Sequence, residues 1–300
     1  MIRIAHHAIY AHPLPEGHRF PMLKYEMLPE QLIIEGTCKR EQFFAPNRIL
    51  EDHIVRTHCA EYYKQLIHLS LSKKEARRIG FPLSKELIER ECVIAQGTLE
   101  GCEYALKHGI SFNIAGGTHH AFFDRGEAFC LLNDQAIAAN YLLHTQKAKQ
   151  ILIIDLDVHQ GNGTAALFRN NPNVYTFSMH GKSNYPFEKE ISDLDIALKD
   201  NIQDREYLHI LARELTQLFE KIKPDFVFYL SGVDVLKEDK LGRLSLTLEG
   251  AKKRDKLVLS SCYAQNIPVQ CSMGGGYAPD VNLIVEAHAN TYRVAADIFE

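Results

Sequence analysis

A cluster of acidic and imidazole groups follows one strongly apolar segment near the middle of the chain. Residues 151–154 are Ile, Leu, Ile and Ile, and Asp155, Asp157 and His159 follow at alternate positions. Side chains two residues apart in an extended backbone point the same way, so these three groups can converge if the chain stays extended. Two carboxylates and an imidazole suit a divalent metal. Charged groups directly against a buried strand are costly, which favours a metal site over simple capping of the strand end.

Three other apolar segments end in groups that could take part in the same chemistry. These groups are a histidine pair, a carboxylate and a phenol, at His119 and His120, Asp234 and Tyr277. Taken alone, the histidines fit a surface turn, the aspartate fits a loop residue bonded to backbone amides, and the tyrosine fits a packing residue on a glycine turn. Taken together, they can supply proton transfer, a metal ligand and a donor to a carbonyl.

An alternation of short apolar runs and longer amphipathic segments positions these groups. The sequence predicts strands at residues 111–114, 151–155, 174–179, 226–231 and 269–273, and helices at 85–107, 205–221, 248–265 and 280–299. This pattern predicts an α/β fold with a central, mostly parallel sheet that is covered by helices on both faces. Ligands of such sheets bind beyond the carboxyl ends of the strands, which is where all four groups stand.

Composition predicts one globular domain over residues 1–300, because the chain has 46% hydrophobic and 24% charged residues and no linker or repeat. The net charge is −4 with both signs interspersed, so no direct nucleic-acid binding is expected. No apolar run approaches the roughly 20 residues of a membrane span, and the N-terminus lacks a secretory pattern. The expected location is cytoplasmic. The seven cysteines form no C-x-x-C pair, which argues against a thiolate zinc site or a disulfide scaffold.

These motifs, in this order, resemble the histone deacetylase family over most of the chain. The resemblance is carried by GGTHHAFFDRGEAFCLLND at 116–134, DLDVHQGNG at 155–163, GVDVLKEDKLGRLSLT at 232–247 and GGGY at 274–277. The segments HQGNG at 159–163, HRFPMLKY at 18–25 and RRIGFPLSKEL at 77–87 look most like the class IV branch and its bacterial relatives. The resemblance implies an arginase/deacetylase-like fold and zinc-dependent hydrolysis of acyl-lysine amides, with acetyl and long-chain acyl groups both as candidates.

The resemblance also implies a metal centre and a tyrosine that acts with it on the substrate carbonyl. Asp157, His159 and Asp234 would be the zinc ligands, and open positions would receive water and the substrate carbonyl. This donor set is also hospitable to Fe²⁺. Tyr277 would donate its hydroxyl to the carbonyl and stabilise the oxyanion of the tetrahedral intermediate.

The histidine pair would handle the protons. By the resemblance, His120 is the general base and later the acid for the leaving amine, while His119 gives electrostatic support. Asp155 would orient His119, and Asn162 would orient His120. Many relatives have aspartate where this chain has Asn162, so the neutral amide is expected to weaken stabilisation of a protonated His120.

The resemblance places a narrow substrate channel and a second ion near the zinc. Phe129 and Tyr185 would form the aromatic walls around the lysine stem, and Gly275 would contact the substrate. Ala128 stands where many relatives have glycine. A structural K⁺ is expected at positions that match the family's potassium site, which are Asp155, Asp157, His159, Ser178 and Met179.

Three alternatives stay open from the sequence. The same zinc chemistry would suit an acetylpolyamine or another acylated small amine. A manganese ureohydrolase of the arginase type would need more carboxylates to bridge two metals, and the histidine pair and Tyr277 disfavour it. A non-catalytic scaffold that binds acyl-lysine or a protein is disfavoured because every role in hydrolysis has a candidate residue.

Overall fold

One eight-stranded sheet forms the centre of the computed structural model, which describes all 300 residues. Every neighbouring pair of strands is parallel, in the order β2-β1-β3-β8-β7-β4-β5-β6. The strands are β1 (Arg3–Ala5), β2 (Phe43–Phe44), β3 (Ile110–Asn113), β4 (Ile151–Asp155), β5 (Val174–Gly181), β6 (Leu194–Leu198), β7 (Phe226–Leu230) and β8 (Val269–Ser272).

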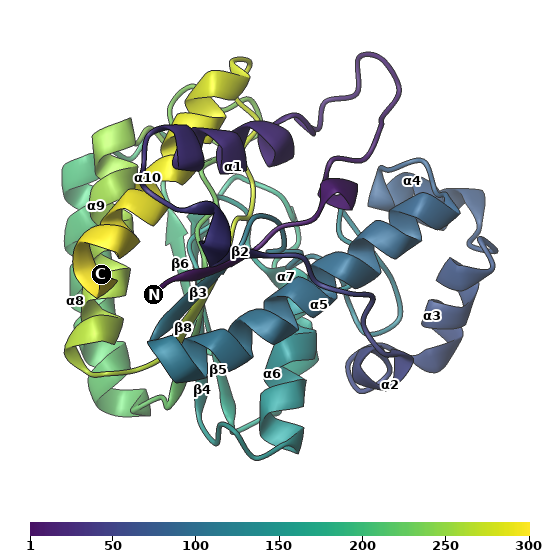
Figure 1. Cartoon of the computed structure of the whole chain (residues 1–300), viewed down its shortest axis with the longest axis horizontal. Helices are drawn as coiled ribbons and strands as arrows, with labels where there is room; N and C mark the ends of the chain where they lie inside the picture. The colour runs from purple at the N-terminus through teal and green to yellow at the C-terminus, as the bar shows by residue number, and fades with distance from the viewer.

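Helices cover both faces of this sheet (Figure 1). One face packs on α1 (Lys24–Ile34), α8 (Asp204–Ile222), α9 (Leu248–Ala264) and α10 (Val281–Phe299). The other face packs on α2 (Glu51–Ile54), α3 (Ala60–Ile67), α4 (Lys73–Ile79), α5 (Lys85–His108), α6 (Asp134–His144) and α7 (Asn162–Phe168). Short 3₁₀ turns, η1 (Ala8–Tyr10) and η2 (Arg40–Gln42), lie in the N-terminal region. The predicted three-layer α/β architecture is confirmed.

Alternate residues of a central strand enter different hydrophobic cores. In β4, Ile151 and Ile153 belong to the core beneath α5 and α6, whereas Leu152 and Ile154 belong to the core on the other face. All five residues of the strand are buried. Both faces of this strand pack in a core, which explains the uninterrupted apolar run of residues 151–154 before Asp155.

The four chemical motifs follow four strands that are neighbours in the sheet. In the order β3-β8-β7-β4, these strands lead into the histidine pair, the GGGY segment, Asp234 and the segment of Asp157. The loops after β3 and β8 touch, because a Cβ atom on Gly117 would lie 2.9 Å from the Cα atom of Gly274. Gly117 also has φ +75°, a conformation that glycine adopts without steric cost. Parallel strands thus gather all four motifs at one edge of the sheet.

The predicted elements match the observed ones to within two residues at either end. The sequence interpretation missed β1, β2 and β6, and also α1–α4, α6 and α7. Strands β1 and β2 have three and two residues, too few to show a period. Strand β6 lies at the sheet edge and four of its five residues are only half-buried or exposed, so it lacks the apolar run of the central strands.

All seven cysteines are free, and six are buried, as expected of small hydrophobic side chains. None of the helices combines the length and the apolar character that a bilayer crossing requires.

Candidate active site

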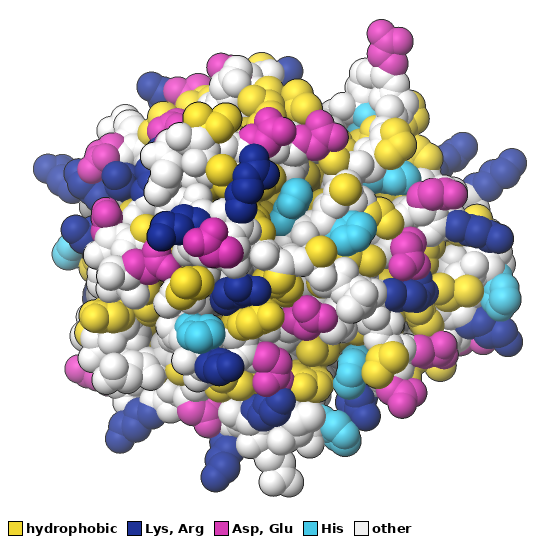
Figure 2. All heavy atoms as spheres, viewed as in Figure 1, with side chains coloured by type: hydrophobic (Ala, Val, Ile, Leu, Met, Phe, Trp, Pro, Cys, Tyr) yellow, Lys and Arg dark blue, Asp and Glu magenta, His cyan; other side chains and the backbone are white.

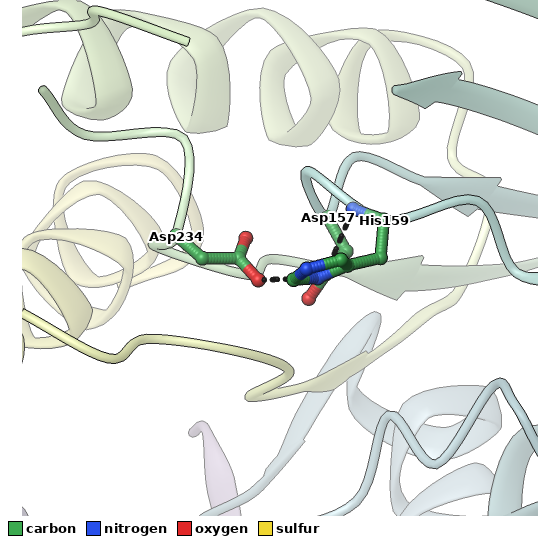
Figure 3. A group of neighbouring side chains, drawn as sticks. All are labelled: Asp157, His159 and Asp234. Carbon is green, nitrogen blue, oxygen red and sulfur yellow. Dashed lines mark hydrogen bonds and ion pairs between the residues drawn. The ribbon is translucent and has the colours of Figure 1, made fainter. Parts of the chain in front are cut away.

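Asp157, His159 and Asp234 meet beyond the ends of β4 and β7 (Figure 3). Nδ1 of His159 lies 3.0 Å from Oδ1 of Asp157 and 3.1 Å from Oδ2 of Asp234. One ligand atom from each residue lies within 4.8 Å of the other two, and all three residues are buried. The amide of Gly275 donates to Oδ2 of Asp157, and that of Val158 donates to Oδ1 of Asp234. Backbone groups therefore fix both carboxylates around the imidazole.

The two carboxylates around His159 favour the binding of a cation. Burial, and next the charge of Asp157, raises the pKa of Asp234 to about 7. Burial disfavours a protonated His159, but the hydrogen bonds that it donates to Asp157 and Asp234 and their negative charges outweigh burial, and its pKa rises to about 10. Without a metal, a proton on His159 thus balances the carboxylates, and a divalent cation would replace that proton. Two carboxylates and one imidazole fit Zn²⁺ or Fe²⁺.

His119 and His120 lie next to each other, with ring centroids 4.1 Å apart. Nδ1 of His119 is 2.6 Å from Oδ2 of Asp155, and Nδ1 of His120 is 2.6 Å from Oδ1 of Asn162. The same Asn162 oxygen also accepts the amide of Gly163 at 3.0 Å. Because it accepts from a backbone N–H, this atom must be the amide oxygen, and Nδ1 of His120 must be the donor. A neutral His120 therefore keeps an unprotonated Nε2.

The two histidines have opposite electrostatic surroundings. Burial disfavours a charged His119, but the carboxylates of Asp155 and Asp157 outweigh burial and raise its pKa. Burial, and then the neighbouring imidazoles of His119 and His159, lowers the pKa of His120 well below its usual value. His119 is thus protonated more readily than a free imidazole, whereas His120 favours the neutral ring that can accept a proton.

An aromatic passage leads from the surface to these groups. An outer cavity of about 500 Å³ has His120, His159, Phe129, Tyr185 and Tyr277 in its wall. An inner cavity of about 50 Å³ shares four of these residues, Tyr185 being the exception. The ring of Tyr185 lies 5.1 Å from that of His120, and the ring of Phe129 lies 6.2 Å from that of Tyr277, between centroids. The two predicted wall aromatics therefore lie beside the predicted catalytic groups.

Tyr277 presents a phenol beside the metal-binding group. Its ring centroid is 6.4 Å from that of His159. Burial, and next the negative charges of Asp157 and Asp234, raises the pKa of Tyr277 well above its usual value. The phenol therefore stays protonated at neutral pH and can donate a hydrogen bond.

Gly275 serves the site through its lack of a side chain. Its amide donates to Asp157 and its carbonyl accepts the amide of Val233 at 2.8 Å. A Cβ atom at this position would lie 2.1 Å from Oδ2 of Asp234. The resemblance placed Gly275 at the substrate. In the structure it packs against the metal-ligand candidates Asp157 and Asp234, and both its amide and its carbonyl are hydrogen-bonded to protein groups.

The residues of the expected potassium site lie at the end of β4 (Asp155), in the loop after it (Asp157 and His159) and within β5 (Ser178 and Met179). Asp155 stands opposite Ser178 in the parallel register, and Met179 follows Ser178. Oδ1 of Asp155 accepts the amide of Asp157 at 3.1 Å. The structure thus brings these residues together, and a bound K⁺ stays a prediction.

Three side chains that the sequence interpretation missed support the site: Asp239 is half-buried, and Lys24 and Arg254 are fully buried. Oδ2 of Asp239 accepts the amide of Tyr277 at 2.6 Å. Nζ of the fully buried Lys24 donates to the carbonyl of Gly274 at 3.3 Å. The guanidinium of Arg254 donates to three carbonyls just after β4 and β7. Charged residues on amphipathic helices usually face solvent, so the sequence offered no signal for Arg254; for Lys24 the only signal was its place in HRFPMLKY.

Comparisons with known proteins agree with this architecture. Residues 18–292 match the histone deacetylase domain. An uncharacterized protein of Picosynechococcus sp. is 42% identical over 296 residues, which is 99% of both chains. The acetoin utilization protein AcuC of Staphylococcus xylosus is 27% identical over 285 residues, covering 87% of this chain and 73% of the relative. The crystal structure of an HDAC homolog from Aquifex aeolicus has a TM-score of 0.84 at 21% identity, covering 98% of this chain and 84% of that one.

The sheet topology and the solved homologue define the arginase/deacetylase-like fold, and the matched domain makes the chain a hydrolase. The chain belongs to the histone deacetylase family, and the family predicted from the four motifs is confirmed.

Proposed function

We propose that this protein is a zinc-dependent deacetylase that hydrolyses the amide bond of acetyl-lysine in a protein or peptide. One observation carries this proposal. Asp157 and His159 of the metal-binding group line the same small cavity as His120, with its unprotonated Nε2, and Tyr277. An amide carbonyl in that cavity would lie beside a hydrogen-bond donor (Tyr277), a base (His120) and a metal-binding group that can stabilise negative charge.

Asp157, His159 and Asp234 would hold the metal. When bound, Zn²⁺ polarises carbonyl groups and lowers the pKa of water to roughly 7. Fe²⁺ would fit the same three ligands, and K⁺ near Asp155 and Ser178 would be a structural ion. The motif HQGNG supports a place in the class IV branch.

The side chains of the chain itself would move the protons. His120, neutral and held by Asn162, would accept a proton from the attacking water at Nε2 and later give it to the leaving lysine nitrogen. His119, held by Asp155, would add positive charge beside the developing oxyanion. Tyr277 would donate its hydroxyl to the carbonyl oxygen as that oxygen becomes negative.

The size of the inner cavity supports a short acyl group. Its volume is about 50 Å³, which is room for only a few water molecules, since each needs at least about 10–15 Å³ on this measure. An acetyl group would fit, whereas a fourteen-carbon chain would require the wall to move. Phe129 and Tyr185 in the outer cavity would contact the apolar stem of the lysine.

The test is metal-dependent release of free lysine amine from matched acetyl-lysine and myristoyl-lysine peptides. The protein is stripped with a chelator and reloaded with Zn²⁺ or Fe²⁺, and Asp157→Ala serves as the metal-site variant. Tyr263→Phe, which removes an exposed hydroxyl on α9, is the control for Tyr277→Phe. We expect zinc to restore hydrolysis and acetyl-lysine to be preferred. Preference for myristoyl-lysine would refute the short acyl group, and no hydrolysis of either peptide with either metal would refute the function.

A further inference from the structure

The mouth of the outer cavity carries three arginines and no acidic side chain. Arg19, Arg78 and Arg243 are all exposed and all belong to its lining, which contains no aspartate or glutamate. Elsewhere basic and acidic side chains are interspersed, as the face in Figure 2 shows. The net charge of the chain is −4, so a local excess of positive charge at this cavity is not a consequence of overall composition.

Arg19 and Arg78 flank one wall of the channel. Arg19 comes from the loop between η1 and α1, which projects from the body of the molecule in Figure 1. Its Cζ atom lies 5.0 Å from the ring centroid of Phe129. The carbonyl of Arg78, near the end of α4, accepts the amide of Ala128 at 3.0 Å, and the carbonyl of Ile79 accepts the amide of Phe129 at 2.6 Å. Both arginines therefore stand at the aromatic entrance.

Arg243 stands on the segment that also supports Tyr277. Its carbonyl accepts the amide of Asn201 at 2.8 Å. The amide of the preceding Gly242 donates to Oδ1 of Asp239 at 2.8 Å, and Oδ2 of Asp239 accepts the amide of Tyr277. The backbone that carries Arg243 is thus tied to the far wall of the same channel.

Neighbouring carboxylates neutralise these three charges only in part. Arg78 lies 3.9 Å from Glu127, whose carboxylate is already 2.9 Å from Arg125. The nearest carboxylate to Arg243 lies at 3.5 Å, and 59% of the Arg243 side chain stays exposed. Arg19 has no carboxylate within ion-pair distance. Three arginines that line one opening therefore leave a positive field there.

We propose that this mouth selects acetyl-lysines whose flanking residues in the substrate polypeptide are aspartate or glutamate. The inference rests on the proposed function and adds the substrate class. Guanidinium groups bind carboxylates with paired hydrogen bonds, and like charges at an interface repel wrong partners. Acetylated polyamines and lysine- or arginine-rich segments are positively charged, so the arginines repel them and they are poor substrates.

The experiment compares four substrates. Three are versions of one acetyl-lysine peptide in which the two positions on each side of the acetyl-lysine are all Asp, all Gln or all Arg, and the fourth is the small cation N-acetylspermidine. The readout is the ratio of kcat/KM values for the zinc-loaded enzyme. Each exposed ion pair is worth a factor of about 1.4 to 5, so two or three engaged pairs should give the Asp peptide a roughly tenfold advantage over the Gln peptide at low salt. We expect the Arg peptide and N-acetylspermidine to fall below the Gln peptide, and high salt to bring the ratios toward one.

The triple variant Arg19→Gln, Arg78→Gln, Arg243→Gln should bring the Asp-to-Gln ratio close to one. Arg213→Gln is the matched control because its side chain on α8 is 56% exposed, close to that of Arg243, and should keep the preference. Equal or reversed ratios in the unaltered enzyme, or a preference that survives in the triple variant, would overturn the proposal. If no peptide is hydrolysed, the proposed function fails instead, and fluorescence anisotropy of the labelled peptides measures the same preference as a ratio of Kd values.

Discussion

Replacement of Asn162 by aspartate would test how this chain sets the protonation of His120. Nδ1 of His120 lies 2.6 Å from the Asn162 oxygen, and the Asp155–His119 pair shows the charged version of the same contact at the same 2.6 Å. The pKa of His119 is raised, despite burial, by its carboxylates, whereas the pKa of His120 is lowered by burial and by the neighbouring imidazoles. An ionised carboxylate in place of the Asn162 amide should therefore stabilise the imidazolium of His120.

The magnitude follows from the short contact. Two unit charges about 4 Å apart interact by about 4 kcal/mol at an effective dielectric constant near 20. Burial of the new carboxylate opposes part of this energy, although the amide of Gly163 already donates to the same atom. Carboxylate neighbours usually shift a buried group by about 1–3 pH units. We expect the acid limb of the pH dependence of kcat/KM to move upward by roughly that amount.

The assay is the kcat/KM profile of the zinc-loaded protein on an acetyl-lysine peptide from pH 5 to 10, with NMR titration of His120 as an independent readout. Asn162→Ala is the control, because it removes the contact without adding charge and should not raise the acid limb. An acid limb that stays in place or moves downward in Asn162→Asp would show that His120 is not the base that limits activity at low pH.

Three further predictions concern the phenol, the metal and one backbone position. Tyr277→Phe should lower kcat by about 10²–10³-fold with an unchanged melting temperature, and unaltered turnover would contradict the oxyanion role. Zinc binding at pH 7 should release about one proton from His159, whose pKa is raised to about 10, so zinc affinity should increase with pH. Calorimetry in buffers of different ionisation enthalpy measures the number of protons released. No proton release would contradict the role of His159 as a zinc ligand. Ala128 has φ +43°, so Ala128→Gly should add about 0.5–1 kcal/mol to the free energy of unfolding. Chemical denaturation measures that gain, and a lower stability of Ala128→Gly would contradict the interpretation that the positive φ of Ala128 strains the backbone.

The central sheet was predictable because its local pattern is strong. Strands β4, β7 and β8 are buried along their whole length, and strands that are buried on both faces are rich in apolar residues. Long helices such as α8 and α10 show helical periodicity because one side packs on the sheet. The short strands β1 and β2 have two or three residues and depend on pairing with β3 and with each other. No local pattern of that length specifies a partner in a distant segment of the chain.

The sequence by itself determined the chemistry and the family. Asp157, His159 and Asp234 were found because they follow strongly apolar runs, and Tyr277 because it follows a glycine run at a predicted strand end. The order of the motifs identified the histone deacetylase family. Residue type and spacing along one segment are enough for such inferences, because the groups after parallel strands share one edge of the sheet.

Only the tertiary structure decided the properties that depend on contacts between distant segments. The tautomer of His120 follows from a shared Asn162 oxygen, and the burial of Lys24 follows from a loop 250 residues away. The arginines of the mouth come from three segments that no periodicity connects. Folding sets which charges face each other and how far water reaches them, and these two quantities fix pKa values and substrate preference.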